Sequence, residues 1–443
     1  VQGDTYVTNS YLEVYDGITR CAKGGDGELW FLNKYGAQIY LCVEKTVPDD
    51  SSKVLLDSVI TQPCPNGYTI TSDIVEIQEG VVIMHCVARL GTTEVWDDSA
   101  GQHGCEITEA EDNGNFNNAN LLSAEDCLSK QQGMKIQGEL SSFEDVDIFK
   151  MDGQWLPGDV IVIESPNSIL NMRVALFDEK GELLGLYFPG RVLDIIFSHR
   201  IFYQLRTRHE SLYLALANHG STNSQGEYSV KIKKSPGEEI VPSSQRVFLN
   251  FEGTTEKFMI SKKVIDGVLK LEDSWLNSAY PERIEEIKRK IKDVVVENYR
   301  NFNVEVYTIE DGLPEEPYST VYFGGDEKAL LGYANSVDTY NQNHADKAIV
   351  FVESFELYHS SGLGTINEDK IARFIGNVAS HELGHLLGLF HVSDCADIMD
   401  TTCSASAGMS DQEFKTSEIH SSSFKVGKQN SPNLLEYATG RSA

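Results

Sequence analysis

Basic residues are scarce in this sequence. Its 443 residues include 37 lysines and arginines against 67 aspartates and glutamates, which gives a formal net charge of −30. A field of that sign repels nucleic acids and anionic membranes, so we expect neither as a partner. The surplus of acidic residues is equally typical of a plain solvated surface, and that interpretation needs no partner at all.

Long apolar runs are also lacking. No stretch reaches the length of about 18 apolar residues that a membrane-spanning helix needs, and the longest, such as residues 81–84, have the length of a strand. We therefore expect no membrane span. Val1 begins the sequence without a basic, apolar leader, so we expect that a secretory signal has been cleaved or is absent from this sequence.

Cysteine is missing from residues 128–394. Two cysteines, Cys395 and Cys403, lie beyond that range, and the other six lie in the first third, at Cys21, Cys42, Cys64, Cys86, Cys105 and Cys127. The even total predicts disulfides and a secreted, extracellular protein, although six cysteines allow too many pairings for their connectivity to be deduced. A Cys395–Cys403 disulfide would close a loop of about nine residues. Metal binding by this pair is the weaker alternative, because zinc clusters normally need two closely spaced pairs.

The length favours two or three domains over a single core. Residues 1–111 contain strand-like runs, clearest at 28–32 and 38–42, between turn residues, and predict a disulfide-rich β domain of unknown role. Residues 112–236 alternate apolar and polar positions between regular turns, which predicts a two-sheet β-sandwich. Residues 237–443 mix strand and helix patterns and predict an α+β domain.

Two helix patterns stand out in this last domain. Residues 281–300 start near a proline and carry an isoleucine and valine stripe at helical spacing, which predicts an amphipathic helix. A second helix is predicted from about Glu368, because acidic residues after Asn367 suit the positive end of a helix dipole. Strands are predicted at residues 247–251, 304–309, 320–323 and 348–352.

The most specific signal of the chain runs from His381 to His391 and reads H-E-x-x-H-x-x-G-x-x-H. Histidines four positions apart share one helix face, so the rings of His381 and His385 can reach one ion at about 2.0–2.1 Å. Gly388 lets the backbone leave the helix, often with φ > 0, so that His391 can return as third ligand. The three histidines are therefore the predicted ligands of one catalytic zinc ion, with a fourth position open for water.

Glu382 follows the first of these histidines, and the motif predicts it as the general base. Three neutral imidazoles leave zinc its full charge, which lowers the pKa of its water to about 7. Glu382 then accepts the proton and passes it to the leaving amine of a cleaved peptide bond. A plain amphipathic core helix explains the leucines of this segment, but it does not explain the histidines and the glycine. The predicted function is a zinc endopeptidase that acts on proteins or peptides.

Met399 follows His391 by eight residues. With this methionine the segment resembles the metzincin clan of zinc endopeptidases, and the Gly-Leu-Phe-His context is most similar to the matrixin branch. The resemblance implies a metzincin-type fold for the last domain and a methionine turn in which Met399 is the hydrophobic floor of the site. The sequence departs from the matrixin pattern at Val392, where serine is usual, and at Asp400-Thr401, where Tyr-Pro is usual.

The middle region resembles the bacterial pre-peptidase C-terminal type of β-sandwich. The resemblance rests on the runs at residues 117–120, 136–140, 145–149, 156–159, 174–178 and 226–230. Within it, Asp145, Asp147 and Asp152 form a candidate site for a structural calcium ion, since calcium prefers clustered oxygen ligands. An acidic turn without an ion is the alternative.

Gly332, Tyr333 and Ala334 precede the last predicted strand. They predict either the upper rim of a substrate cleft or a plain surface loop, and an extended substrate is expected to pair with an edge strand. One rival function is an adhesin or glycan-binding protein, whose first domains would bind extracellular matrix or cell-surface glycans. Another is a zymogen in which part of residues 1–110 inhibits the zinc site.

Overall fold

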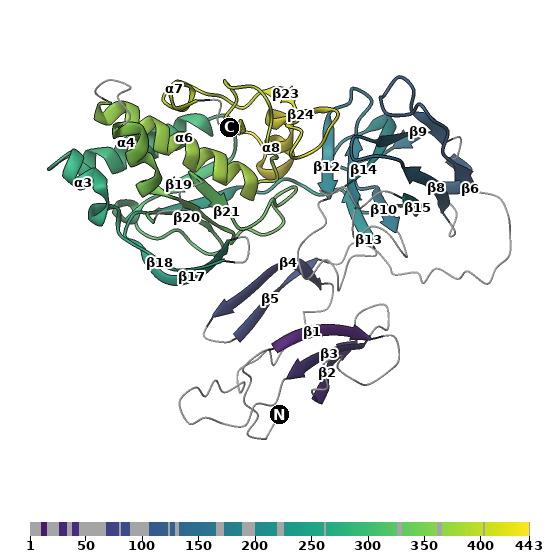
Figure 1. Ribbon diagram of the computed structural model, residues 1–443, viewed down its shortest axis with the longest axis horizontal. Coiled ribbons are helices and arrows are strands. Elements are labelled where there is room, and N and C mark those ends of the chain that lie inside the picture. The colour runs from purple at the N-terminus through teal and green to yellow at the C-terminus, as the bar shows by residue number, and fades with distance from the viewer. Residues whose placement is uncertain are drawn as a thin grey trace.

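From residue 106 on, the described part of the chain forms a β-sandwich and then an α+β domain (Figure 1). The structure is a computed structural model, and before residue 106 it describes strands only. From there it describes residues 106–122, 125–128, 133–164, 172–187, 200–218, 226–260, 263–325, 330–360, 366–401 and 404–442. The predicted fold class, an all-β part followed by an α+β part, is confirmed.

The structure describes five strands before residue 106. They are β1 (Ser10–Tyr15), β2 (Asp26–Leu32), β3 (Gln38–Val43), β4 (Tyr68–Gln78) and β5 (Val81–Ala88). The first three form an antiparallel sheet of order β1-β3-β2, and β4 pairs with β5. The side chains of this region lie outside the described part, so the disulfides predicted here stay predictions.

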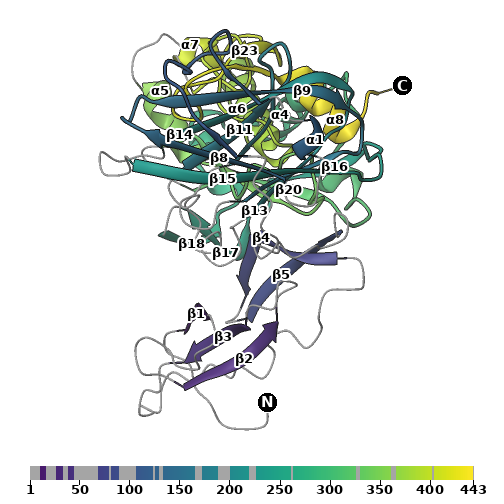
Figure 2. The same ribbon diagram turned by 90° about the vertical axis from the view of Figure 1, so that its right-hand side faces the viewer.

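Two five-stranded sheets form the sandwich, with orders β13-β10-β15-β8-β6 and β12-β11-β14-β9-β7. Their strands are β6 (Glu106–Thr108), β7 (Asn120–Leu122), β8 (Met134–Leu140), β9 (Val146–Trp155), β10 (Val160–Glu164), β11 (Met172–Phe177), β12 (Leu183–Tyr187), β13 (Arg200–Gln204), β14 (His209–Asn218) and β15 (Gly226–Ser235). In Figure 2, β9 and β14 lie above β8 and β15. Alternate residues of each strand point inward and build one core, in which Phe149 and Trp155 are buried.

The sandwich includes residues on both sides of the range 112–236 that was predicted for it. β6 pairs in parallel with β8, so the sandwich begins before residue 112. A four-residue helix, α1 (Glu125–Leu128), follows β7. At the other end, the chain just after β15 lies against the sandwich, where Gln204 Nε2 donates to the carbonyl of Glu238 at 2.7 Å.

A mixed sheet of order β19-β16-β20-β22-β21 is the framework of the α+β domain. Its strands are β16 (Gln245–Asn250), β19 (Val304–Tyr307), β20 (Ser319–Phe323), β21 (Gly332–Ala334) and β22 (Lys347–Val350). β16, β19, β20 and β22 are parallel and match the four predicted strands. β21 pairs antiparallel with β22 at the edge of the sheet, so the predicted rim segment is itself a strand.

The two predicted helices are α4 (Ile284–Asn298) and α6 (Glu368–Leu386), which lie side by side (Figure 1). α4 turns its apolar stripe into the core of this domain. Asn367 caps the start of α6, and its side chain accepts from the third N–H of the helix. Gly376 permits the close approach, because a Cβ there would lie 2.7 Å from Cβ of Val294. None of the helices described is long and apolar enough to cross a membrane.

Several elements of this domain have no counterpart among the predicted ones. The first group is the hairpin β17 (Thr254–Ile260) and β18 (Lys263–Val268), η2 (Leu271–Asp273), α3 (Trp275–Ala279), η3 (Ile309–Asp311), η4 (Val352–Phe355) and α5 (Glu356–Ser360). The second group follows the zinc motif and comprises α7 (Ala405–Gly408), β23 (Thr416–Glu418), β24 (Lys428–Asn430) and α8 (Ser431–Thr439). All are short or lack the glycine and asparagine turns that mark hairpins, so periodicity alone does not reveal them.

Candidate metal centre

The C-terminal end of α6 carries His381 and His385, and Gly388 lies just beyond it. Gly388 has φ +95, which confirms the predicted exit from the helix. A Cβ at this position would also lie only 2.8 Å from Cα of Thr339, so space and backbone conformation both require glycine. The chain then turns back, and this return brings His391 to the two histidines of the helix.

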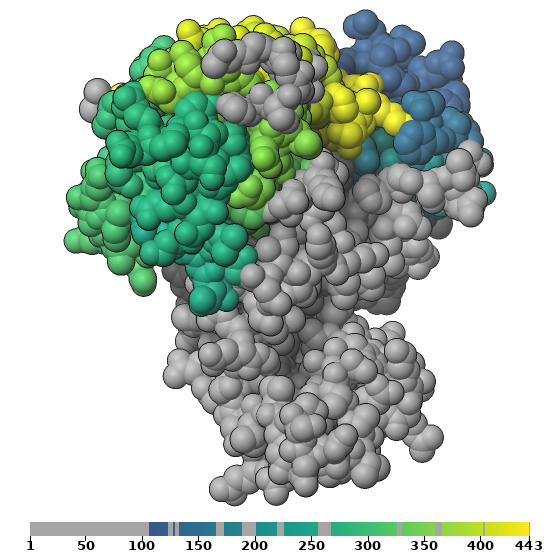
Figure 3. Space-filling view, turned by 60° about the vertical axis from the view of Figure 1, so that its left-hand side comes forward, coloured from purple at the N-terminus to yellow at the C-terminus, as the bar shows by residue number. Residues whose placement is uncertain are grey.

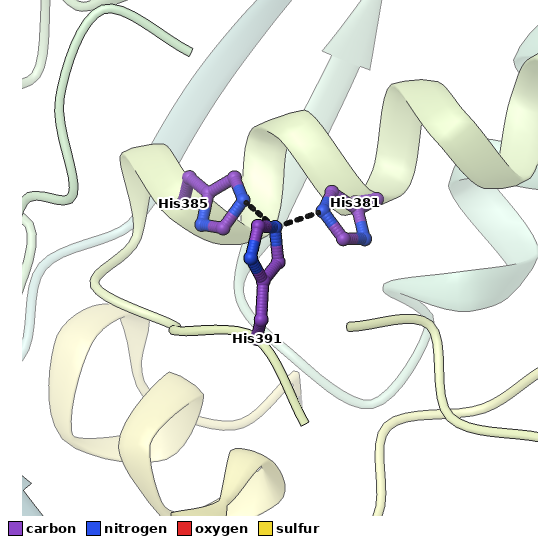
Figure 4. A group of neighbouring side chains, drawn as sticks. All are labelled: His381, His385 and His391. Atoms are coloured by element: carbon purple, nitrogen blue, oxygen red, sulfur yellow. Dashed lines mark hydrogen bonds between the residues drawn. The ribbon is translucent and has the colours of Figure 1, made fainter. Parts of the chain in front are cut away.

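The three Nε2 atoms converge on one point (Figure 4). His391 Nε2 lies 3.1 Å from Nε2 of His385 and 3.1 Å from Nε2 of His381. Nδ1 of His381 is 2.8 Å from the carbonyl of Ile398, and Nδ1 of His385 is 2.7 Å from that of Leu389. Because a carbonyl only accepts, both Nδ1 atoms carry the hydrogen, and a neutral ring then has a bare Nε2.

This arrangement of nitrogens fits a cation. The bare Nε2 atoms of His381 and His385 both face His391, which has at most one Nε2 hydrogen to give. Zinc accepts imidazole nitrogens at about 2.0–2.1 Å, and a carbonyl that holds the opposite ring nitrogen is the usual way of orienting such ligands. The predicted ligands His381, His385 and His391 are thus brought together with the chemistry that zinc requires.

Burial keeps these imidazoles neutral. Desolvation lowers the pKa of His381, and it lowers the pKa of His385 well below its usual value, with further repulsion from the other two rings. The pKa of His391 falls to about 3, first through desolvation and then through His381 and His420. The neutral ring is the form that binds a metal, so the site needs to lose no proton at neutral pH.

Met399 lies against the helix that carries two of the histidines. It is fully buried, and a Cβ on Gly384 would lie 2.5 Å from its Sδ, so this glycine makes room for the methionine. The carboxylate of Asp397 accepts from the N–H of Met399 at 3.0 Å and shapes the turn. Val392 N–H donates to the carbonyl of Met399 at 3.0 Å, which ties the turn to the residue after His391.

Glu382 is buried beside the edge strand β21. A Cβ on Gly332 would lie 2.5 Å from its Oε1, and the backbone of Ala334 hydrogen-bonds its carboxylate. Burial raises the pKa of Glu382 to about 8, and the bond from Ala334 opposes that rise. A carboxyl group tuned toward neutral pH can take up and return a proton, as a general base must. A cation at the histidines would lower this pKa by Coulomb attraction.

The predicted rim residues therefore lie beside the predicted base. Gly332, Tyr333 and Ala334 form the outermost strand of the described sheet. An edge strand offers backbone N–H and C=O groups with which an extended peptide can pair. Their role as a substrate rim stays a prediction.

The predicted disulfide at the methionine turn is described on one side only. Cys395 is disulfide-bonded, as is Cys127. Cys403 lies outside the described residues, so the Cys395–Cys403 pairing stays a prediction.

A second group of metal-ligating residues lies in the sandwich. Carboxylate oxygens of Glu109, Glu111 and Asp147 lie within 4.8 Å of one another. The Tyr228 hydroxyl lies 2.7 Å from both Glu109 Oε2 and Asp147 Oδ2. Desolvation, followed by Glu109, raises the pKa of Asp147 to about 8.

One buried oxygen of this group, Oδ1 of Asp147, lacks a hydrogen-bond donor among the described residues. Buried acceptors are normally paired, and acceptors gathered with carboxylates match the oxygen ligands that calcium prefers. This donor set fits a hard cation such as calcium, whereas the histidine set fits zinc.

The structure corrects the predicted set of calcium ligands. Asp152 does not belong to it, because its carboxylate pairs with Lys150 at 2.8 Å. Asp147 and Asp152 are an odd number of positions apart on β9, so their side chains point to opposite faces. Asp145 lines the same pocket as Glu111. Glu109 and Glu111 were not predicted as ligands, although their alternation just before a turn-rich segment was the available signal.

The third such group among the described residues is Asp178, Glu179 and His209. His209 is buried, with Nδ1 at 3.0 Å from Glu179 Oε2 and Nε2 at 2.9 Å from the hydroxyl oxygen of Thr207. Both ring nitrogens therefore have partners within the protein. His209 is thus a buried histidine whose polar atoms are satisfied within the protein.

Comparisons with known proteins gave distant structural likenesses only. No protein-family model matches the chain, and no curated protein matches it in sequence. Among solved structures, archaemetzincin from Methanopyrus kandleri is similar to 40% of this chain over 92% of its own length, with 15% identity and a TM-score of 0.23. A zinc-dependent peptidase from Methanocorpusculum labreanum is similar to 39% of this chain over 95% of its own length, with 13% identity and a TM-score of 0.23.

A third likeness covers a smaller share of this chain. The pre-peptidase C-terminal domain of a collagenase from Bacillus anthracis is similar to 23% of this chain over 89% of its own length, with 16% identity and a TM-score of 0.18.

Proposed function

We propose that the protein is a zinc-dependent endopeptidase of metzincin type. The observation that carries this proposal is the convergence of three neutral imidazoles, from His381, His385 and His391, on one point beside a buried carboxyl group. Zinc, when bound, supplies a Lewis acid that polarises a peptide carbonyl and acidifies water.

The chain's own residues supply the remaining chemistry. The substrate pairs with the edge strand β21 through backbone hydrogen bonds, and this pairing aligns the peptide with the histidine site. Glu382 accepts the proton of the attacking water and then donates it to the leaving amine. Gly332 keeps the carboxylate in place, because its missing Cβ leaves the space that Glu382 Oε1 fills.

Replacing the base tests the proposal. Glu382→Gln should bind one zinc ion per chain like the wild type, yet its kcat/KM should fall by about 100- to 10,000-fold, because the amide takes up no proton. Hydrolysis of a fluorogenic peptide library and the zinc content by mass spectrometry are the measurements.

Glu368→Gln is the matched control, since Glu368 lies at the opposite end of α6. It should keep both zinc and turnover. Undiminished hydrolysis by Glu382→Gln, or equal hydrolysis by the metal-free wild type, would refute the proposed function.

We also propose that the protein acts outside the cell. The disulfide-bonded states of Cys127 and Cys395 support an oxidising compartment. Thiol alkylation before and after reduction, followed by mass spectrometry, tests this. Alkylation of all eight cysteines without reduction would contradict it.

Finally, we propose that Glu109, Glu111 and Asp147 hold a structural calcium ion. Their oxygens, together with the buried Oδ1 of Asp147 that lacks a donor among the described residues, support an oxygen-liganded cation.

A further inference from the structure

β24 lies between the sandwich and the segment that carries the third histidine. Lys428 N–H donates to the carbonyl of Gly181 at 2.9 Å, and Asn430 Nδ2 donates to Glu182 Oε2 at 2.9 Å. Both ends of β24 are thus bonded to the turn that precedes β12, beside which it lies in Figure 1. In Figure 3 the yellow C-terminal segment lies between the green part of the α+β domain and the blue sandwich.

Gln429, between these two residues, bonds to the zinc motif. Its side chain is fully buried, and its Oε1 accepts from the N–H of Phe390 at 2.7 Å. Its Nε2 donates to the carbonyl of the same residue at 2.8 Å. A residue held at both its N–H and its C=O has little freedom to shift. Because Phe390 directly precedes His391, this pair of bonds fixes the position of the backbone from which the His391 side chain extends.

The side chain of Phe390 is buried in a core shared with the sandwich. This core joins Phe390, Ile419 and Phe424 to sandwich residues that include Ile148, Ala175, Phe177 and Ala215. The sandwich contributes here the sheet face opposite to the one that builds its own core. The Phe177 and Phe424 rings lie 5.9 Å apart, and a Cβ on Gly427, just before β24, would lie 2.3 Å from the Phe177 ring.

A second connection reaches the zinc motif from its other side. The hydroxyl of Tyr340 donates to the carbonyl of Leu184, in β12 of the sandwich, at 2.5 Å. The backbone from Asp338 to Tyr340 is what a Cβ on Gly388 would strike. The turn at Gly388 and the backbone of Phe390 therefore both contact segments that are hydrogen-bonded to the sandwich.

We propose that the sandwich helps to position the zinc ligands. Gln429 is the positioning residue through which contacts with the sandwich fix the place of His391. This inference rests on the proposed zinc function. Gln429 contacts Phe390 rather than the metal or the substrate, and its effect passes through the backbone to the ligand. Removing the bonds between Gln429 and Phe390 loosens His391, the one ligand of the three that does not belong to α6.

The test compares two buried glutamines in the full chain. Gln429→Met removes both bonds to Phe390 with little change in size. Gln204→Met is the control, because Gln204 is also buried and its Nε2 donates to the carbonyls of Gly158 and Glu238, which lie outside the zinc motif and the segments that support it. We expect Gln429→Met to raise the zinc dissociation constant by about 10- to 100-fold, as the loss of a group that orients a metal ligand does. It should also change the visible absorption spectrum of bound Co²⁺.

The control variant should lose thermal stability and leave both metal readouts unchanged. If Gln429→Met unfolds, Phe177→Leu loosens the same support from the sandwich side, and it should raise the zinc dissociation constant in the same direction by less. The proposal is overturned if Gln429→Met, or Phe177→Leu in its place, keeps the wild-type zinc affinity and Co²⁺ spectrum. Failure of the wild type to bind zinc would instead overturn the proposed function, so the two failures are distinguishable.

Discussion

Among the described residues, burial acts in opposite directions on two groups of candidate metal ligands. In the α+β domain, desolvation lowers the pKa of the three histidines, so the rings are neutral and ready to bind at neutral pH. In the sandwich, desolvation raises the pKa of Asp147 to about 8, so a proton competes with any cation there. The same physical cause prepares the nitrogen site for zinc and makes the oxygen site sensitive to pH.

The largest effect is expected when one nitrogen is removed. His385→Ala should raise the zinc dissociation constant by about 100- to 1,000-fold, because a zinc site worth roughly 10–16 kcal/mol loses one of its three protein ligands. Competition with a chromogenic chelator measures this, and peptide hydrolysis should be lost with the metal.

His209→Ala is the control, since His209 is buried in the sandwich and bonded within it. It should leave zinc affinity unchanged. Equal loss of zinc in both variants would contradict the proposed zinc site, because zinc binding would then depend on any buried histidine and not on the three of the motif.

A smaller effect is expected when the base is displaced and the ligands are kept. Gly332→Ala places a Cβ 2.5 Å from Oε1 of Glu382, so the carboxylate must move. We expect kcat/KM to fall by about 10- to 100-fold, a part of what general-base catalysis supplies. The zinc content should not change.

Gly114→Ala serves as the control, because an added Cβ there meets only the Val146 carbonyl, at 3.4 Å. It should hydrolyse peptides like the wild type. A Gly332→Ala variant with full turnover would show that Glu382 does not depend on the edge strand.

The smallest effect is expected at the oxygen site, as a change of stability with pH. The folded pKa of Asp147, about 8, lies above its ordinary value of 3.8. Its contribution to the free energy of unfolding is therefore fully present below pH 3.8 and is lost as the pH rises through about 8. Without calcium, the melting temperature should fall over that range, by about 2–4 °C for each kcal/mol lost.

Calcium should remove this slope, because the cation replaces the proton that the carboxylate loses. Asp147→Asn should remove both the slope and the effect of calcium, and calorimetry at pH 5 and pH 8 with zinc present measures both. The calcium site is contradicted if the wild type and Asp147→Asn respond equally to calcium.

The two sites also differ in how far the sequence predicted them. The histidines lie within eleven residues, so helical spacing and one glycine were enough to predict that they meet. The oxygen site joins Glu109 and Tyr228, which are 119 positions apart. Asp152 was assigned to it wrongly, because clustering in sequence does not tell which face of a strand a side chain takes.

By itself, the sequence determined the zinc motif, the helix that carries it, the positions of four strands and the change from an all-β to an α+β part. Each depends on local spacing or periodicity, which a window of neighbouring residues contains. The tertiary structure alone decided that Gly332–Ala334 is the edge strand beside Glu382, and that Gln429 bonds to Phe390 across 39 positions of the chain. These contacts arise where separate segments pack together, and no local pattern encodes which segments will meet.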